Sequence, residues 1–387
     1  MRALLILTIC FSGQLLDSNA LAQWTQRADF GSFGRHRGAA IDIGNKGYCG
    51  MGHLNGTGID TWYPDWWQYD PAIDTWTQKA DYPGNSGNGD QDVVLISVGL
   101  MAYGGLGQID GNGFYKYDPS INQWSQITSP PITLAFNDVT PFTIGDKGYF
   151  AALFSDIFFE YDPSLDTWTQ LNNIPFTTNW GTPSFTINGK GYMKNGADFY
   201  EYSPATDSWA FKAQFPGLTP NRPKGISQYN YGFIIGGFTD LPWVWSKNVW
   251  RYDPVTDSWT QLGDFPGSTR RWALIMNIND HVYYGLGTNG TNFNDFWEFN
   301  SIAESNEIMA STFNVYPTLA DEHINFSSEE NQEFNVSIYN LNGELIKSIS
   351  TENGEIKFSR SYLSSGTYIY HISVKDQVIK TDKFVFI

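Results

Sequence analysis

The chain has 387 residues, of which 17% are aromatic and 16% charged, and it contains 38 glycines. Aromatic residues favour strands, and frequent Gly and Pro favour tight turns, so the composition predicts an all-β protein. The formal net charge of −17 makes nucleic acid and anionic membrane surfaces poor partners, because an acidic surface repels phosphate groups.

The first 22 residues have the pattern of a secretory signal peptide. Arg2 supplies a positive start, Leu4 to Phe11 form a short apolar run, and Ala20-Leu21-Ala22 is a small-x-small cleavage pattern. Gln23 is then the first mature residue. Since a bilayer-spanning helix needs about 20 apolar residues, we expect no transmembrane segment.

Cys49 is the one cysteine that remains after removal of this segment, because Cys10 lies within it. A single thiol forms neither an internal disulfide nor a zinc site. We expect Cys49 to be a buried structural thiol, since it lies in a strand pattern.

One phrase recurs through most of the chain: an aromatic residue, x, Tyr, Asp and Pro, then two residues, Asp or Asn, x and Trp. Full copies begin at the following residues, the fourth with Ser in place of the first Asp: Trp67, Tyr115, Phe159, Tyr200 and Trp250. A sixth copy begins at Trp297 and stops before its Trp. The missing half lies at Trp24, where the sequence matches the segment that starts at Trp76.

The split sixth copy predicts a closed ring in which the N-terminal strand completes the last sheet, so that no sheet edge remains open. We expect the repeated Tyr and Trp to form the core between sheets. The Asp or Asn before x-Trp is expected to accept backbone hydrogen bonds within its own turn.

The repeat resembles the kelch family, which has a Gly-Gly pair ending strand two, a Tyr in strand three and a Trp in strand four. Gly-Gly pairs occur at Gly104-Gly105 and Gly236-Gly237. The resemblance implies a six-bladed kelch-type β-propeller over residues 23–300.

A different pattern follows a predicted linker at residues 301–307. Residues 308–387 show short alternating strands with a hairpin signal at Asn342-Gly343, which predicts a small immunoglobulin-like β-sandwich. The segments at 313–317, 336–343 and 363–370 resemble the C-terminal sorting domain of the type IX secretion system. This resemblance implies interaction with that machinery and a protein secreted from, or attached to the outer surface of, a Gram-negative bacterium. A binding sandwich with no export role is the alternative.

Candidate binding residues come from the loops that crowd one face of a propeller around its axis. The loops before each first strand contain these polar and aromatic residues: Arg37, Asp92, Asp138, Trp180, Arg222 and Arg271. These groups either bind a ligand or simply solvate the rim and pair with one another.

Two long predicted loops, residues 52–66 and 239–248, contain tryptophans outside the repeat phase: Trp62, Trp66, Trp243 and Trp245. Aromatic side chains flanked by Asp and Asn suit stacking on sugar rings or gripping a peptide. Burial within the loops is the alternative.

Catalysis has less support in the sequence. His36 with Asp92 or Asp138 would supply the acid or base that a mutarotase needs. Oxidases of the kelch-type fold use a copper site with two histidines, and because no histidine pair is evident in the sequence we reject that function. We expect no metal or cofactor and assign no catalytic residue. The hypothesis is a secreted or surface binding protein whose propeller recognises carbohydrate or another extracellular polymer. The alternatives are a sugar-processing enzyme and a protein–protein interaction scaffold.

Overall fold

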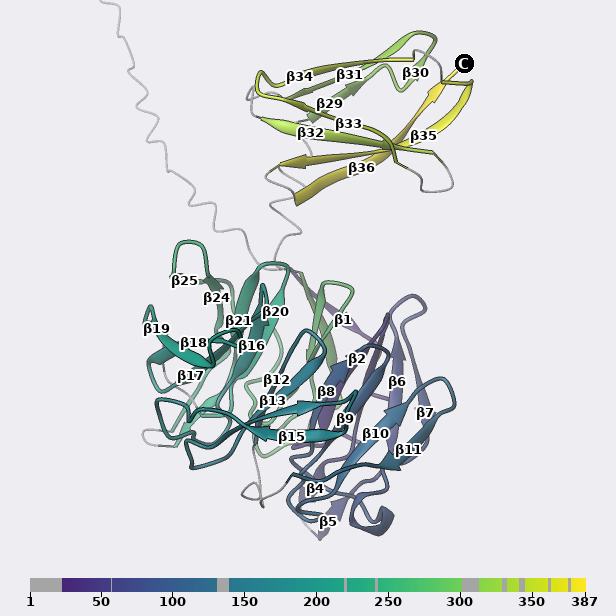
Figure 1. Cartoon of the computed structure of the whole chain (residues 1–387). Coiled ribbons are helices and arrows are strands. Elements are labelled where there is room, and N and C mark those ends of the chain that lie inside the picture. Colours follow the sequence, from purple (N-terminus) through teal and green to yellow (C-terminus); the bar gives the residue numbers. More distant parts are fainter. Residues whose placement is uncertain are drawn as a thin grey trace, which may run out of the picture. The chain divides into compact units, whose positions relative to one another are not determined.

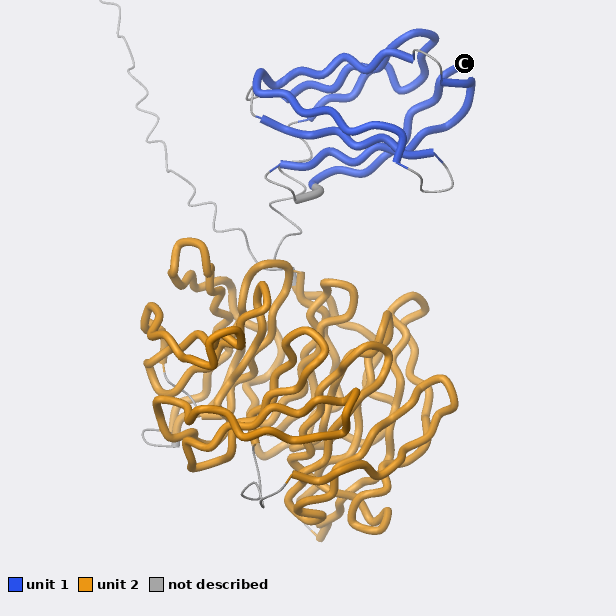
Figure 2. Tube along the Cα trace, viewed as in Figure 1, with its two compact units in different colours: residues 1–21, 302–387 blue, residues 22–301 orange. Residues whose placement is uncertain are grey.

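The computed structural model describes residues 23–387 apart from 57, 131–138, 219–220, 241–242, 301–312, 329–332, 341–344, 361–362 and 375–376. The predicted signal peptide, the predicted linker, the Asn342-Gly343 turn and Asp138 lie outside the described residues. The chain divides into two compact units, one over residues 22–301 and the other over residues 302–387 (Figure 2).

The described part of the larger unit is built from six four-stranded antiparallel sheets, numbered here in chain order (Figure 1). The first sheet contains β2 (Ala39–Ile43), β3 (Lys46–Gly50), β6 (Trp66–Asp70) and β7 (Thr75–Lys79). The second contains β8 (Val94–Val98), β9 (Met101–Gly105), β10 (Phe114–Asp118) and β11 (Gln123–Gln126). The third contains β12 (Thr140–Ile144), β13 (Lys147–Ala151), β14 (Phe158–Asp162) and β15 (Thr167–Gln170).

The fourth sheet contains β16 (Ser184–Ile187), β17 (Lys190–Asn195), β18 (Asp198–Ser203) and β19 (Ser208–Lys212). The fifth contains β20 (Lys224–Gln228), β21 (Tyr231–Ile235), β24 (Val249–Asp253) and β25 (Ser258–Gln261). The sixth contains β26 (Leu274–Ile278), β27 (His281–Gly285), β28 (Phe296–Asn300) and β1 (Gln23–Arg27). A short 3-10 turn, η1 (Gly84–Gly87), precedes β8.

The sixth sheet joins the two ends of this unit. β1 pairs antiparallel with β28, from Gln23 opposite Asn300 to Arg27 opposite Phe296, which is the pairing that the split repeat predicts. The first strands of the sheets, β2, β8, β12, β16, β20 and β26, contact one another in a closed cycle. The six sheets therefore surround a common centre.

The recurring Tyr and Asp or Asn connect five of the six sheets to the sheet before them. The Tyr hydroxyl donates to the carboxylate or amide oxygen at 2.6–2.9 Å in five sheets: Tyr69 to Asp74, Tyr117 to Asn122, Tyr161 to Asp166, Tyr202 to Asp207 and Tyr252 to Asp257. The same five acceptors receive a backbone N–H from the end of the preceding sheet at 2.9–3.2 Å, from Ala28, Ala80, Thr128, Asn172 and Ala213. The expectation that these side chains serve their own turn is wrong, because the turn points its acceptor at the neighbouring sheet.

Aromatic packing reinforces the same junctions. In each of these five sheets the recurring Trp packs on the recurring Tyr, with ring centroids 4.9–5.0 Å apart. The indole Nε1 of Trp76 donates to the Ala28 carbonyl of the preceding sheet at 3.1 Å, and Trp124 does the same to Ala80 at 3.0 Å. The repeated aromatics thus form core and junction, as the sequence predicts. Cys49 is buried in this core, and burial raises the pKa of its thiol.

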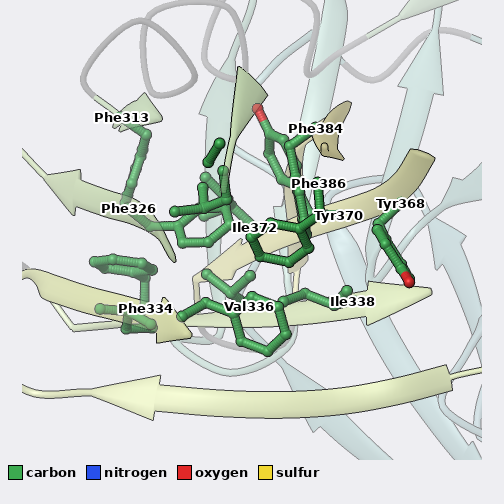
Figure 3. Packing of buried hydrophobic residues seen from close by; sticks show 14 of the residues in the cluster. Phe313, Phe326, Phe334, Val336, Ile338, Tyr368, Tyr370, Ile372, Phe384 and Phe386 are labelled. Atoms are coloured by element: carbon green, nitrogen blue, oxygen red, sulfur yellow. The ribbon is translucent and has the colours of Figure 1, made fainter. Parts of the chain in front are cut away.

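The smaller unit packs two sheets face to face around one apolar core. One sheet contains β29 (Phe313–Tyr316), β31 (His323–Ser328) and β34 (Glu355–Ser359); the other contains β30 (Leu319–Ala320), β36 (Gln377–Phe386), β35 (Gly366–Val374), β32 (Phe334–Tyr339) and β33 (Leu345–Thr351). Figure 3 shows Phe326, Tyr370 and Phe384 together in this core, and the Phe326 and Tyr370 rings meet edge to face at 5.2 Å. Alternate residues of β35 and β32 are buried, as the alternating pattern predicts.

An ionic network links β1 to β28 and β27 in the sixth sheet. Glu298 accepts from Arg27 Nε at 2.7 Å and from His281 Nδ1 at 2.5 Å. The bond to Glu298 raises the pKa of His281 despite partial burial. Burial raises the pKa of Glu298, but hydrogen bonds from His281 and Arg27 outweigh it, so this pKa lies below its usual value.

We expect Asp166→Ala to lower the free energy of unfolding by about 1–3 kcal/mol, because the Tyr161 hydroxyl and the Thr128 amide lose their acceptor. Urea unfolding followed by tryptophan fluorescence reports on the larger unit alone, since all 15 tryptophans lie within it. Asp166→Asn is the matched control and should resemble wild type, because Asn122 occupies this position in the second sheet. An alanine variant as stable as wild type would contradict the assigned role.

We expect the stabilisation from His281 to weaken as the pH rises. A histidine whose pKa increases on folding stabilises fully below its unfolded pKa of about 6.5, and this contribution is lost as the pH rises through the folded pKa. The difference in unfolding free energy between wild type and His281→Gln should therefore be largest near pH 5.5 and shrink above pH 7. Urea titrations at four or five pH values measure it, and a difference that does not vary with pH argues against the network.

Candidate ligand-binding site

The loops before the first strands place four side chains at equivalent positions. Arg37, Asp92, Arg222 and Trp272 each lie two residues before β2, β8, β20 and β26, with φ of 58°, 55°, 57° and 52°. This left-handed conformation is sterically unfavourable for Arg and Trp. Such strained residues cluster at binding and catalytic sites, so the set marks a candidate site.

Trp272 is the common contact of three arginines. The guanidinium carbons of Arg37, Arg271 and Arg222 lie 4.1, 4.2 and 4.6 Å from its ring centroids. Trp272 is only 9% exposed, so these cation–π contacts are largely desolvated. Arg37 Nη1 also forms an ion pair with Asp92 Oδ2 at 2.5 Å. We call Arg37, Arg222, Arg271 and Trp272 the arginine–tryptophan cluster.

Two cavities meet at this cluster. A central one of about 600 Å³ is lined by the first strands of all six sheets, and a smaller one of about 420 Å³ shares Arg37 and Trp272 with it. The smaller cavity is also lined by His36, His53 and Arg271. Cavities of this size, with a few convergent polar groups, suit a small molecule or one segment of a polymer.

A histidine pair forms one wall of the smaller cavity, which corrects the expectation that no such pair exists. The backbones of His36 and His53 exchange hydrogen bonds of 3.0 and 2.8 Å, and their rings lie 5.2 Å apart. The pair was missed because it forms between a loop and the first residue of β4, which are separate in the sequence. Burial lowers the pKa of His36 to about 4, with His53 and two arginines adding to the effect and a hydrogen bond to Asn292 opposing it. Within the described residues, no cluster of three or more His, Cys, Asp or Glu side chains could hold a metal ion.

The two predicted long loops are hairpins in the structure. β4 (His53–Gly56) pairs with β5 (Ile59–Trp62), which Figure 1 shows at the lower end of the larger unit. β22 (Phe238–Asp240) pairs with β23 (Trp243–Trp245). Each segment is long enough for two short antiparallel strands with side chains on alternate faces, so it folds as a hairpin.

The tryptophans of these segments have different surroundings. Trp62 stacks flat on His53, with ring centroids 5.0 Å apart, and so supports the cavity wall. Trp245 packs on Phe238 at 4.4 Å and lies 5.9 Å from Arg271, while Trp243 is 77% exposed.

Trp66 is fully buried at the start of β6, where it packs on Trp124 at 5.6 Å. Its prediction as a ligand contact is wrong, because the strand begins one residue earlier than the sequence pattern indicates.

Trp180 joins the cluster through Arg222, whose guanidinium carbon lies 5.4 Å from the Trp180 ring. Phe154 meets Trp180 edge to face at 5.2 Å and was not predicted from the sequence. Arg35 and Arg270, by contrast, are buried and form bidentate ion pairs with Asp65 and Asp295, so their role is structural.

The structure thus brings together Arg37, Asp92, Trp180, Arg222 and Arg271 of the predicted set. Trp62 stacks on the cavity residue His53, and Trp245 lies near the cavity residue Arg271. Trp66 is buried in the core, and Asp138 lies outside the described residues. Trp272 was overlooked, although it also stands outside the repeat phase and occupies the position of Arg37 in the first sheet.

Comparisons with known proteins agree with this architecture. Residues 314–387 match the family described as the secretion system C-terminal sorting domain, and residues 233–266 match the kelch motif. The chain combines a kelch-type propeller with a type IX sorting domain. It is therefore a secreted, cell-surface or extracellular protein, and its sorting domain is the part that interacts with the secretion machinery. No helix in the described part of the chain has the length and hydropathy needed to cross a membrane.

The kelch-type propeller is also similar to a solved structure, that of YjhT, with a TM-score of 0.56 and 14% sequence identity. The similarity covers 70% of this chain and 96% of the YjhT chain. At this identity the likeness concerns the fold. No curated protein matches the chain.

We expect the His36 imidazole to titrate near pH 4 in the folded protein and near its ordinary value of about 6.5 in urea. Because folding lowers this pKa, the stability that depends on neutral His36 is lost as the pH falls from about 6.5 towards 4. NMR of the imidazole protons measures the titration, and His36→Gln assigns the resonance. A midpoint between pH 6 and 7 in the folded protein would overturn the buried placement.

Proposed function

We propose that the protein is a binding protein whose propeller recognises carbohydrate, or another extracellular polymer, at the arginine–tryptophan cluster. The observation that carries the proposal is the convergence of three guanidinium groups on Trp272 beside a cavity of about 420 Å³. Guanidinium and amide groups bind sugar oxygens, and aromatic faces stack on sugar rings.

Polar donors surround the cavity on several sides. Besides the cluster, the cavity is lined by Asn55 of β4 and by Gln91 and Gln108 of loops next to β8 and β9. Groups that converge from separate sheets are held by the rigid scaffold, which reduces the ordering cost of binding.

The same proposal includes the finer architecture. We take the six sheets as the six blades of a complete propeller over residues 23–300, and the two sheets of the sorting domain as an immunoglobulin-like sandwich within residues 308–387. Residues 1–22 are then a signal peptide and residues 301–307 a linker. The closed cycle of first strands supports the blade number.

A glycan-array screen followed by affinity measurements tests the function. We expect Arg271→Ala to weaken binding of an array hit at least tenfold, which corresponds to about 1.4 kcal/mol, while Arg251→Ala binds like wild type. Arg251 is a matched control because it also stacks on an aromatic ring, that of Tyr231 at 4.7 Å, yet lines neither cavity. The proposal fails if no glycan binds, or if the two variants bind equally well.

A sugar-processing enzyme of mutarotase or lyase type is the second candidate, and the position of His36 favours it. Burial lowers the pKa of His36 to about 4, so its imidazole is neutral at physiological pH and a ring nitrogen can accept a hydrogen bond from a ligand hydroxyl in the cavity. NMR of anomeric exchange on the array hit distinguishes the two functions. Exchange that the protein accelerates and His36→Gln abolishes indicates an enzyme, and binding without exchange indicates a binding protein.

A further inference from the structure

We propose that Asn292 positions His36 so that its Nε2 atom accepts a hydrogen bond in the smaller cavity, and that the ligand supplies an uncharged hydroxyl group there. Asn292 is then a positioning residue, and the ligand places a neutral sugar in this cavity rather than an amino sugar or a sugar acid. This inference rests on the proposed function and adds to it the charge class of the ligand and the residues that select it.

The orientation of the Asn292 amide is fixed by its two partners. Its Nδ2 donates to the backbone carbonyl of Asn55 at 2.8 Å, and a carbonyl only accepts. Its Oδ1 therefore faces the second partner, Nδ1 of His36, at 2.9 Å. Because an amide oxygen also only accepts, Nδ1 carries the proton of the neutral imidazole.

Nε2 is then the nitrogen of His36 that has a lone pair. His36 is 3% exposed and lines the smaller cavity. Within the described residues, the bond from Nδ1 to Asn292 is the one hydrogen bond of this ring, and Nε2 is not among the polar atoms that are both sealed from solvent and unpaired. The lone pair is therefore available to a molecule in the cavity.

The first and sixth sheets together hold Asn292 beside His36. Asn292 belongs to the loop between β27 and β28, whereas His36 precedes β2. The Arg35 amide donates to the Phe293 carbonyl at 3.2 Å, and a Cβ atom at Gly34 would lie 2.6 Å from the Asn292 carbonyl oxygen. The two loops therefore approach closely because position 34 is a glycine, and the backbone places the asparagine.

Charged ligand groups fit this position poorly. Burial is the main cause of the low pKa of His36. Arg37, Arg271 and His53 lower this pKa further. A positive charge beside the ring is therefore unfavourable, which argues against the ammonium group of an amino sugar. A carboxylate oxygen has no hydrogen to donate to Nε2, whereas a hydroxyl donates without adding charge.

Histidine NMR of the free protein tests the positioning role. The chain has five histidines, so isotopic labelling of their ring nitrogens gives a spectrum that His36→Gln assigns. At neutral pH we expect the proton of His36 on Nδ1. His53 is an internal reference with a proton on Nε2, because that atom donates to Asp60 Oδ1 at 2.6 Å. A proton on Nε2 of His36 in the wild-type protein overturns the inference.

Paired variants separate positioning from folding. Asn292→Ala should move the His36 proton towards Nε2, because Nδ1 loses its acceptor, whereas Asn292→Asp should keep it on Nδ1. Asn289→Ala is the matched control, since Asn289 lies in the same loop but accepts from the Thr291 amide. Tryptophan fluorescence melting establishes that the variants are folded. An unchanged tautomer in folded Asn292→Ala contradicts the positioning role.

Calorimetry with short oligosaccharides tests the ligand class. The probes are trimers of glucose, mannose and galactose, with trimers of glucosamine and galacturonate as their charged counterparts. We expect at least one neutral trimer to bind about tenfold more tightly than both charged trimers. Asn292→Ala should weaken its binding about fivefold, as expected for one lost hydrogen bond, and Asn289→Ala should leave it unchanged.

The outcomes separate this inference from the proposed function. A charged trimer that binds as tightly as every neutral one overturns the ligand class and leaves carbohydrate binding intact. Equal binding by the wild type and Asn292→Ala overturns the role of Asn292 in recognition. If none of the trimers binds, the ligand class is overturned, the glycan array decides on carbohydrate binding separately, and the tautomer of His36 still decides the positioning role.

Discussion

The antiparallel pairing of β1 with β28 is the constraint on which the larger unit depends. It places a strand from the beginning of the propeller beside one from its end, and it completes the sixth sheet. The first strands then contact one another in a closed cycle, so the loops that precede them meet around one centre. The candidate site consists of these loops and the neighbouring hairpins, and without the closure its residues would have no common location.

The same repeat that builds the sheets also fixes the residues of the site. Each Tyr–Asp or Tyr–Asn pair reaches across to the backbone of the preceding sheet and sets the spacing between neighbours. Arg37, Asp92, Arg222 and Trp272 occupy one equivalent position in four sheets, all in the left-handed region. Because the backbone position is the same in each sheet while the side chain differs, a regular scaffold presents a varied binding surface.

The fold could be predicted from the sequence because its determinants recur. The Tyr and Trp phrases repeat along the chain, and the half-copy at Trp24 supplies the half that the copy at Trp297 lacks, which predicted the β1–β28 pairing. The acceptors Asp74 and Asn122 were assigned to the wrong partner, because a turn residue's orientation towards the preceding sheet has no signature in its own segment.

The site was only partly predictable because its determinants occur once each. Arg37, Arg222 and Arg271 were identified from their loop positions, but their meeting on Trp272 depends on the closed cycle. The hairpin β4–β5 places His53 against His36, and the sequence around neither histidine predicts this contact. Trp66 was misplaced for the opposite reason, since a strand boundary that is wrong by one residue turns a core residue into an apparent loop residue.

Phe299 stands in the sixth sheet where the other five sheets have Tyr, so this sheet has no Tyr hydroxyl to donate to a junction acceptor. Here Trp24 packs on Phe299 of its own sheet at 4.8 Å and on Phe265 of the fifth sheet at 5.0 Å. Asn277 of the sixth sheet also donates to the Ser227 carbonyl of the fifth at 2.7 Å. Because this seam needs the N-terminal strand, it forms last in a chain that emerges from the N-terminus, after residue 300 has been delivered. Until then β1 has no partner strand, and an exporting cell has that interval in which to keep its edge from pairing with another copy of the chain.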